Sequence, residues 1–158
     1  GMDLTELTVG DVAPDFELPR DGGASMALSA HAAKPVVLYF SPKDDTSGCT
    51  AEAIAFSGLR KEFAKAGAAV IGMSPDSPKS HDKFKAKHAL DLDLVSDEEK
   101  KTLLAYGVWV EKSMYGRKYM GVERSTFLIG KDGRIARIWR KVSVPGHAED
   151  VLKAVQAL

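Results

Sequence analysis

The feature that most constrains the fold is Val36–Phe40, a run of five apolar, β-prone residues directly after Pro35. A strand with one face in water alternates apolar and polar residues, whereas a strand covered on both faces is apolar throughout. The run therefore predicts a central strand with other elements packed on both faces of its sheet. Ala68–Met73 repeats the pattern and predicts a second buried strand.

The segment between these strands carries the pattern of an amphipathic helix. From Cys49 or Thr50 to Ala66, apolar residues recur at steps of three and four, and Gly67 stands where such a helix ends. Strand, helix and strand in this order form a βαβ unit, whose strands are parallel and whose crossover is right-handed. The sequence thus predicts an α/β fold.

Local signals predict the elements on either side of this unit. Before it, residues 13 to 30 hold two prolines and an Asp-Gly-Gly turn between short apolar pieces, the pattern of a small hairpin. After it, the sequence predicts a helix from Pro78 to about His88 with Ser77 as N-cap, and a short strand around Leu92 and Leu94. A helix is then predicted over residues 97–106, with Ser96 and Glu99 as its capping box. The last predicted elements are strands at Ser125–Ile129 and Ile135–Trp139, joined by a turn at Lys131–Arg134, and a helix over residues 148–157. Lys112 to Lys118 is interpreted as a polar loop.

This order of elements predicts one α/β domain over residues 1–158, with a thioredoxin-like plan. It comprises a central mixed β-sheet flanked by helices and an N-terminal β-hairpin extension. No linker or internal repeat divides the chain, and a chain of this length buries about two-thirds of its unfolded surface. Gly1, which precedes Met2, is interpreted as a remnant of expression cloning and left out of the fold.

The charge balance and the single cysteine limit the partners and the compartment. Lysines and arginines number 22, as do aspartates and glutamates, so nothing favours nucleic acid or an anionic membrane as partner. No apolar run approaches the ~20 residues that span a bilayer. The N-terminus is acidic and lacks an apolar signal core, and an internal disulfide needs two cysteines. These features predict a protein of the reducing cytoplasm.

The one cysteine, Cys49, is predicted at the first turn of a helix, after a loop that leaves the carboxyl end of a buried strand. Ligands of open α/β sheets bind outside those strand ends. A helix N-terminus also offers unpaired N–H groups and a positive dipole end, which stabilise a thiolate, the reactive form of cysteine. The alternative, a buried structural thiol, fits poorly with the polar, glycine-containing segment 44–48.

The segment Pro42–Thr50, with the sequence PKDDTSGCT, resembles the P-x-x-x-T-x-x-C active-site motif of peroxiredoxins. It is most similar to the bacterioferritin-comigratory, or Q-type, subfamily. Further resemblance lies in Ala13–Phe16, in Ile71–Pro78 and in Arg124–Ile129, in the order of the family. The resemblance implies a thioredoxin-like fold, no cofactor, and a thiol-dependent peroxidase for hydrogen peroxide and organic hydroperoxides that serves antioxidant defence and redox homeostasis.

The resemblance also implies roles for individual residues. Cys49 would be the peroxidatic cysteine, and the Thr46 hydroxyl would lie between thiolate and peroxide. Arg124 would stabilise the thiolate and polarise the O–O bond, and Pro42 would shield the site from water. The N–H groups of Gly48 and Cys49 would hold a peroxide oxygen. These roles agree with the chemistry, since displacement at oxygen needs an ionised sulfur and donors for the leaving alkoxide.

Glu52 lies three residues after Cys49, on the same predicted helical face. By the resemblance it belongs to the substrate-binding set and orients Arg124. A solvated first-turn glutamate, favoured by the helix dipole, is the alternative.

The chain departs from the subfamily at Ile54. Many Q-type members carry a resolving cysteine at that position, and this chain has no second cysteine anywhere. A one-cysteine mechanism with an external thiol is therefore predicted, in which thioredoxin, a glutaredoxin or a small thiol reduces oxidised Cys49. The chain is expected to be a monomer or a weak homodimer, and a disulfide through Cys49 between two copies is the competing outcome.

Three other functions compete with a peroxidase. A thioredoxin-type disulfide oxidoreductase needs C-x-x-C, but positions 46 and 52 are Thr and Glu. An inert structural domain does not account for Thr46, Cys49 and Arg124 together. A redox sensor, oxidised once at Cys49 to signal, has the same site chemistry and stays open. No metal is predicted, because the four histidines share no metal-ligand spacing (His31, His81, His88, His147).

Overall fold

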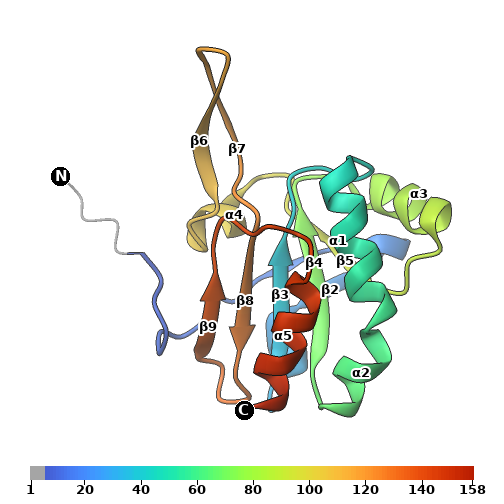
Figure 1. The fold of residues 1–158 in the computed structure, drawn as a ribbon, viewed down its shortest axis with the longest axis vertical. Coiled ribbons are helices and arrows are strands. Elements are labelled where there is room, and N and C mark those ends of the chain that lie inside the picture. Colours follow the sequence, from blue (N-terminus) through green and yellow to red (C-terminus); the bar gives the residue numbers. More distant parts are fainter. Residues whose placement is uncertain (1–5) are drawn as a thin grey trace.

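Five strands form a central mixed sheet in the order β5-β4-β3-β8-β9 (Figure 1). The structure is a computed structural model that describes residues 6–158, so the interpretation of Gly1 lies outside the described residues. The strands are β3 (Val36–Phe40), β4 (Ala69–Ser74), β5 (Asp93–Ser96), β8 (Ser125–Ile129) and β9 (Ile135–Trp139). The first three are parallel, and β8 and β9 extend the sheet antiparallel. The predicted parallel βαβ unit is confirmed.

The sheet is covered on both faces, which explains the unbroken apolar run of β3. All five residues of β3 are buried, and they alternate between two core clusters. One cluster includes residues of α1 (Ser47–Gly58), α2 (Arg60–Lys65), α3 (Pro78–His88) and α5 (His147–Gln156). The other includes residues of the N-terminal segment and of α4 (Lys101–Ala105). Figure 1 shows α2 following α1 end to end, with α5 beside them in front of the sheet.

The N-terminal extension is a hairpin of β1 (Glu17–Pro19) and β2 (Ser25–Ala27), as predicted. A 3-10 turn at Asp21–Gly23 joins its strands, and a second one, Leu28–His31, leads towards β3. The predicted start of α3 is also confirmed, because the Ser77 hydroxyl accepts a hydrogen bond from the Ser80 N–H. The strands β8 and β9 have the predicted bounds.

The helix after β3 differs from its prediction at both ends. It begins at Ser47, two residues early, because Thr46 in extended conformation already serves as N-cap. It is interrupted at Leu59, where ψ is 5° and a new helix, α2, begins. Gly67 follows α2 with φ of 83°, and its N–H bonds to the Ala64 carbonyl. The glycine stop is therefore confirmed, although two helices replace the one predicted.

The capping box at Ser96 and Glu99 is wrong. Ser96 is the last residue of β5 and is buried, so it cannot face a helix N-terminus. The chain turns through Asp97–Lys100, and α4 begins only at Lys101, after Lys100 in left-handed conformation. The hydrogen-bond acceptor for the first turn of α4 is Asp97 instead, because its carboxylate accepts from the Leu103 N–H.

The polar loop predicted at Lys112 to Lys118 is instead the end of a hairpin. Its strands are β6 (Trp109–Met114) and β7 (Arg117–Val122), and they pair with each other only. Tyr115 and Gly116 both have positive φ, as a type I′ turn requires. The hairpin projects from the body of the molecule, so both of its faces contact solvent (Figure 1). Its sequence therefore lacks the alternation of apolar and polar residues that marks a half-buried strand.

Candidate active site

Cys49 lies in the first turn of α1, at the end of the loop that leaves the carboxyl end of β3. Its side chain is 2% exposed. The first hydrogen bond of the helix runs from the Thr50 N–H to the Thr46 carbonyl, and the Thr46 side chain caps none of the preceding N–H groups. The N–H groups of Gly48 and Cys49 therefore have no partner within the helix, as the predicted peroxide-oxygen site requires.

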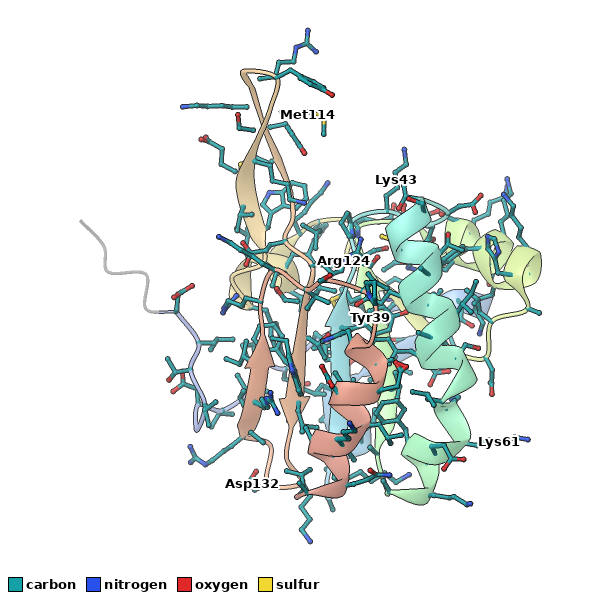
Figure 2. The ribbon with its side chains drawn as sticks, viewed as in Figure 1. Tyr39, Lys43, Lys61, Met114, Arg124 and Asp132 are labelled. Atoms are coloured by element: carbon teal, nitrogen blue, oxygen red, sulfur yellow. The ribbon has the colours of Figure 1, made fainter. Side chains whose placement is uncertain are left out.

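Strand register brings Arg124 to the same place. Phe40 of β3 pairs with Ser125 of β8, so the residue before β8 lies beside the residue after β3. Arg124 Nη2 donates to Cys49 Sγ at 3.5 Å, and Nη1 donates to Ser41 Oγ at 3.5 Å. Figure 2 labels Arg124 and Tyr39 at the end of the sheet where β3 leads into α1. The structure thus joins two predicted site residues that lie far apart in the sequence.

Glu52 completes this cluster and is not the solvated glutamate of the alternative interpretation. It is 1% exposed, and its Oε1 accepts from Arg124 Nη1 at 2.7 Å. Burial lowers the pKa of Arg124, but Glu52 and Cys49 raise it by more, so the guanidinium stays charged. Burial raises the pKa of Glu52 to about 7, an effect that Arg124 only partly offsets. Glu52 Oε2 has no protein partner among the described residues.

The Glu52 pKa predicts a pH dependence of stability. The pKa of this carboxyl rises from 4.5 in the unfolded chain to about 7 in the folded protein. Its contribution to the stability of the fold is therefore fully present below pH 4.5 and is lost as the pH rises towards 7. Glu52→Gln removes this titration, so the fall in unfolding free energy between pH 4.5 and 7.5 should be smaller in the variant. Urea unfolding at both pH values measures it, with the exposed Glu62→Gln as control. An unchanged fall in Glu52→Gln would contradict the assignment.

Gly48 allows Arg124 to reach the sulfur. A Cβ built on Gly48 would lie 2.9 Å from Arg124 Nη2, closer than side chains pack. Its backbone is not in the left-handed region, so close approach, rather than conformation, is what requires glycine here.

Gly48→Ala should therefore displace the guanidinium and slow the reaction of Cys49 with peroxide by roughly tenfold or more. Stability should change little, because alanine suits the first turn of a helix better than glycine. Single-turnover kinetics and urea unfolding together check this, with Gly58→Ala as matched control, where a Cβ meets open space. Equal slowing in the two variants would remove the steric argument.

Thr46 lies in the loop, but the structure does not bring its hydroxyl into a hydrogen bond with Cys49. The exposed Thr46 hydroxyl donates to the Lys43 carbonyl at 2.8 Å, and Pro42 is half-buried. Lys43, which the motif did not single out, contributes its N–H to Cys49 Sγ at 3.5 Å. The sulfur therefore has two donors, one from the backbone of its own loop and one from Arg124.

Sequence reasoning also missed how the loop is anchored. Asp44 accepts hydrogen bonds from Ser80 and His81 of α3. Asp45 has φ of 63° and pairs with Lys87 and His88 at the surface. Aspartates in a turn indicate in general that hydrogen bonds anchor the loop, but the sequence does not reveal which helix provides the partners.

A family model with the description AhpC/TSA family matches residues 9–138. Peroxiredoxin Bcp of Bacillus subtilis is 47% identical over 150 residues, which cover 95% of this chain and 96% of that protein. Peroxiredoxin Bcp of Xanthomonas campestris is 46% identical over 156 residues and 98% of each. Among the described residues, no helix combines the length and apolar character needed to cross a membrane.

Solved structures agree with these relatives. Xanthomonas campestris Peroxiredoxin Q superposes with a TM-score of 0.88 at 46% identity, over 96% of each chain. A cysteine-to-serine mutant of Xylella fastidiosa PrxQ gives 0.92 at 41% identity, over 97% of this chain and 98% of that one. The predicted thioredoxin-like fold and the resemblance to Q-type peroxiredoxins are confirmed. The chain belongs to the AhpC/TSA family and, within it, to the Bcp peroxiredoxins, which are thiol-dependent peroxidases.

Proposed function

We propose that Cys49 is the peroxidatic cysteine of a one-cysteine peroxidase that reduces hydrogen peroxide and organic hydroperoxides. The observation that carries the proposal is the pair of donors on its sulfur, the Lys43 N–H and the Arg124 guanidinium, each at 3.5 Å. Alkyl peroxide reduction is ascribed to the bacterioferritin comigratory protein of Xanthomonas campestris, whose structure is 46% identical in sequence, and this supports alkyl hydroperoxides as substrates here.

The reaction is a displacement at oxygen. The Cys49 thiolate attacks one peroxide oxygen, an S–O bond forms, and the O–O bond breaks. The leaving alkoxide takes up a proton and departs as alcohol, or as water from hydrogen peroxide, and Cys49 is left as a sulfenic acid. Arg124 stabilises the thiolate and the charge that develops on the peroxide, because its donors are fixed and permanently charged. Glu52 holds Arg124 in place.

The remaining roles belong to the loop. The N–H groups of Gly48 and Cys49 hold the peroxide oxygen, and the Thr46 hydroxyl comes to lie between thiolate and peroxide when it turns away from the Lys43 carbonyl. Pro42 limits the access of water. Because Cys49 is 2% exposed, only a small reactant reaches it without movement of the loop.

An external thiol completes the cycle, since the chain has one cysteine. The first thiol condenses with the sulfenic acid, releasing water and forming a mixed disulfide, and a second thiol displaces Cys49 and leaves as disulfide. Two solved structures of the Xanthomonas campestris protein are cysteine-to-serine mutants at different positions, so that relative has at least two cysteines. Thioredoxin, a glutaredoxin or a small thiol is the proposed reductant of a monomeric or weakly dimeric, cytoplasmic enzyme.

Peroxide consumption by the purified protein with a panel of thiol reductants tests this function. Repeated turnover with at least one thiol is the expected result. Oxidation of one equivalent followed by arrest with every thiol would contradict catalysis and favour the sensor.

Over-oxidation provides a second prediction. Without a partner cysteine the Cys49 sulfenic acid should persist, and excess peroxide should convert it to sulfinic and sulfonic acids that thiols cannot reduce. Intact-mass spectrometry at stepwise peroxide ratios follows the added oxygens, with protein supplied with thiol as control. Burial of Cys49 keeps the sulfur of another copy away, so a disulfide dimer as main product of stoichiometric peroxide would contradict the prediction.

A further inference from the structure

His81 of α3 is buried behind the loop that carries the active-site motif. It is 1% exposed, and both of its ring nitrogens have partners. Nδ1 lies 2.7 Å from Asp44 Oδ2, and Nε2 lies 3.1 Å from the carbonyl oxygen of Val95 in β5. The histidine therefore links the loop to the edge strand of the central sheet.

These partners determine the protonation of the ring. A backbone carbonyl only accepts hydrogen bonds, so Nε2 carries a proton. Asp44 Oδ2 also accepts from the Ser80 hydroxyl at 2.8 Å, and an ionised carboxylate, which is acceptor-only, accepts from Nδ1 as well. Both nitrogens then donate, and the ring is an imidazolium.

The charges around His81 favour this form. Burial lowers the pKa of His81, but Asp44, the Val95 carbonyl and Asp76 together raise it by more, so the net direction is upward. Asp44 faces it from the loop, and Asp76 from the segment before α3. The ligand atoms of Asp44, Asp76 and His81 lie within 4.8 Å of one another, but 2.7 Å between Nδ1 and Oδ2 is a hydrogen-bond distance, and the cluster is connected without an ion.

Asp44 connects this ion pair to the sulfur. It follows Lys43, whose N–H donates to Cys49 Sγ, and its own N–H donates to Asp76 Oδ2 at 2.8 Å. Asp44, His81 and Cys49 line one small cavity of about 10 Å³. An uncompensated Asp44 carboxylate there would oppose a thiolate, and a free loop would move the Lys43 N–H away from the sulfur.

We infer that the His81 imidazolium is a positioning residue for the reaction at Cys49, which neutralises Asp44 and fixes the loop with the Lys43 N–H on the sulfur. The inference rests on Cys49 as the reacting thiol, as proposed above. His88 provides the matched control, since it also belongs to α3 and pairs with a loop aspartate, but that aspartate, Asp45, is exposed, so the ion pair contributes little.

Single-turnover kinetics with hydrogen peroxide test the role. His81→Gln leaves the Asp44 charge unpaired and should lower the rate constant roughly ten- to a hundredfold. Asp44→Asn combined with His81→Gln removes both charges and should recover part of that loss, and His88→Gln should react like the unmodified protein. A rate for His81→Gln equal to that of the unmodified protein, or a double variant slower than His81→Gln, would overturn the inference.

The pH profile separates positioning from a purely structural role. Above the His81 pKa, Nδ1 loses its proton, because the Val95 carbonyl holds the proton on Nε2, and the ring no longer neutralises Asp44. The unmodified protein should therefore lose rate on the alkaline side of its profile, and His81→Gln should lack this step. The same alkaline step in both proteins would overturn the inference.

A measurement on the unmodified protein tests the inference without depending on whether a variant of the site folds. Nitrogen-15 NMR shifts of the histidine rings, assigned through the His88→Gln spectrum and those of other histidine variants, report the proton on each nitrogen. Both His81 nitrogens should be protonated below a titration midpoint that lies above the ordinary value of about 6.5. A midpoint at or below the ordinary value would contradict the inference while leaving the role of Cys49 untouched.

Discussion

Cys49→Ser should reduce peroxide consumption to the uncatalysed background, a loss of roughly a thousandfold or more. The serine hydroxyl is far less nucleophilic than a thiolate, and no second cysteine can replace the sulfur. The fold should persist, because the two side chains have the same shape. Peroxide consumption with the best thiol of the panel measures the activity, and circular dichroism measures the fold.

Ser47→Ala is the control for this variant. Ser47 lies in the same first turn of α1 but is exposed, so its loss should leave activity within about twofold of the unmodified protein. More than trace activity in Cys49→Ser would refute the assignment of the nucleophile.

Arg124→Ala should slow the reaction of Cys49 with peroxide by roughly 10² to 10³, the usual effect of removing a preorganised donor. It removes the side-chain donor on the sulfur and leaves Glu52, which is 1% exposed, without its partner. Arg124→Lys should recover only part of the rate, because an ammonium cannot donate to Glu52 and the sulfur in the same fixed geometry. Rapid-mixing kinetics with hydrogen peroxide measure both variants.

A second substitution separates lost catalysis from lost stability in Arg124→Ala. Without Arg124 nothing offsets the effect of burial on the pKa of Glu52, so near neutral pH the carboxyl takes up a proton, and the loss of its hydrogen bond to Arg124 lowers the stability of the variant. Glu52→Gln in the Arg124→Ala background replaces the carboxyl by a group that cannot ionise, and it should restore stability at alkaline pH, where the buried carboxyl would ionise, without restoring the rate. Recovery of the rate together with stability would show that Arg124 acts through the fold alone.

Most of the fold could be predicted because its signals are local. Apolar runs marked the buried strands, and Ser77 and Gly67 marked the ends of helices that the structure confirms. The β6–β7 hairpin was missed because both of its faces contact solvent, so apolar and polar residues do not alternate along its strands. Ser96 was misassigned because a capping-box spacing can occur by chance beside a strand whose burial is set by its neighbours.

The candidate site could be predicted only in part. The motif around Cys49 indicated the thiol, and the resemblance indicated Arg124, but the contact between them depends on the register of β3 and β8. The ion pair of Asp44 and His81 could not be predicted, since it joins a loop to a helix that is separated from it by α1, α2 and β4. Such contacts are tertiary, and no local spacing in the sequence encodes them.

Trapping of the first oxidation product tests the central claim most directly. The protein is treated with one equivalent of hydrogen peroxide in the presence of a dimedone-type reagent, which reacts with sulfenic acids, and its peptides are then mapped by mass spectrometry. Peptide mapping is needed because the five methionines can also gain one oxygen each. The account predicts a single adduct on Cys49 in nearly every molecule. An unmodified Cys49 beside oxidised methionines would contradict it.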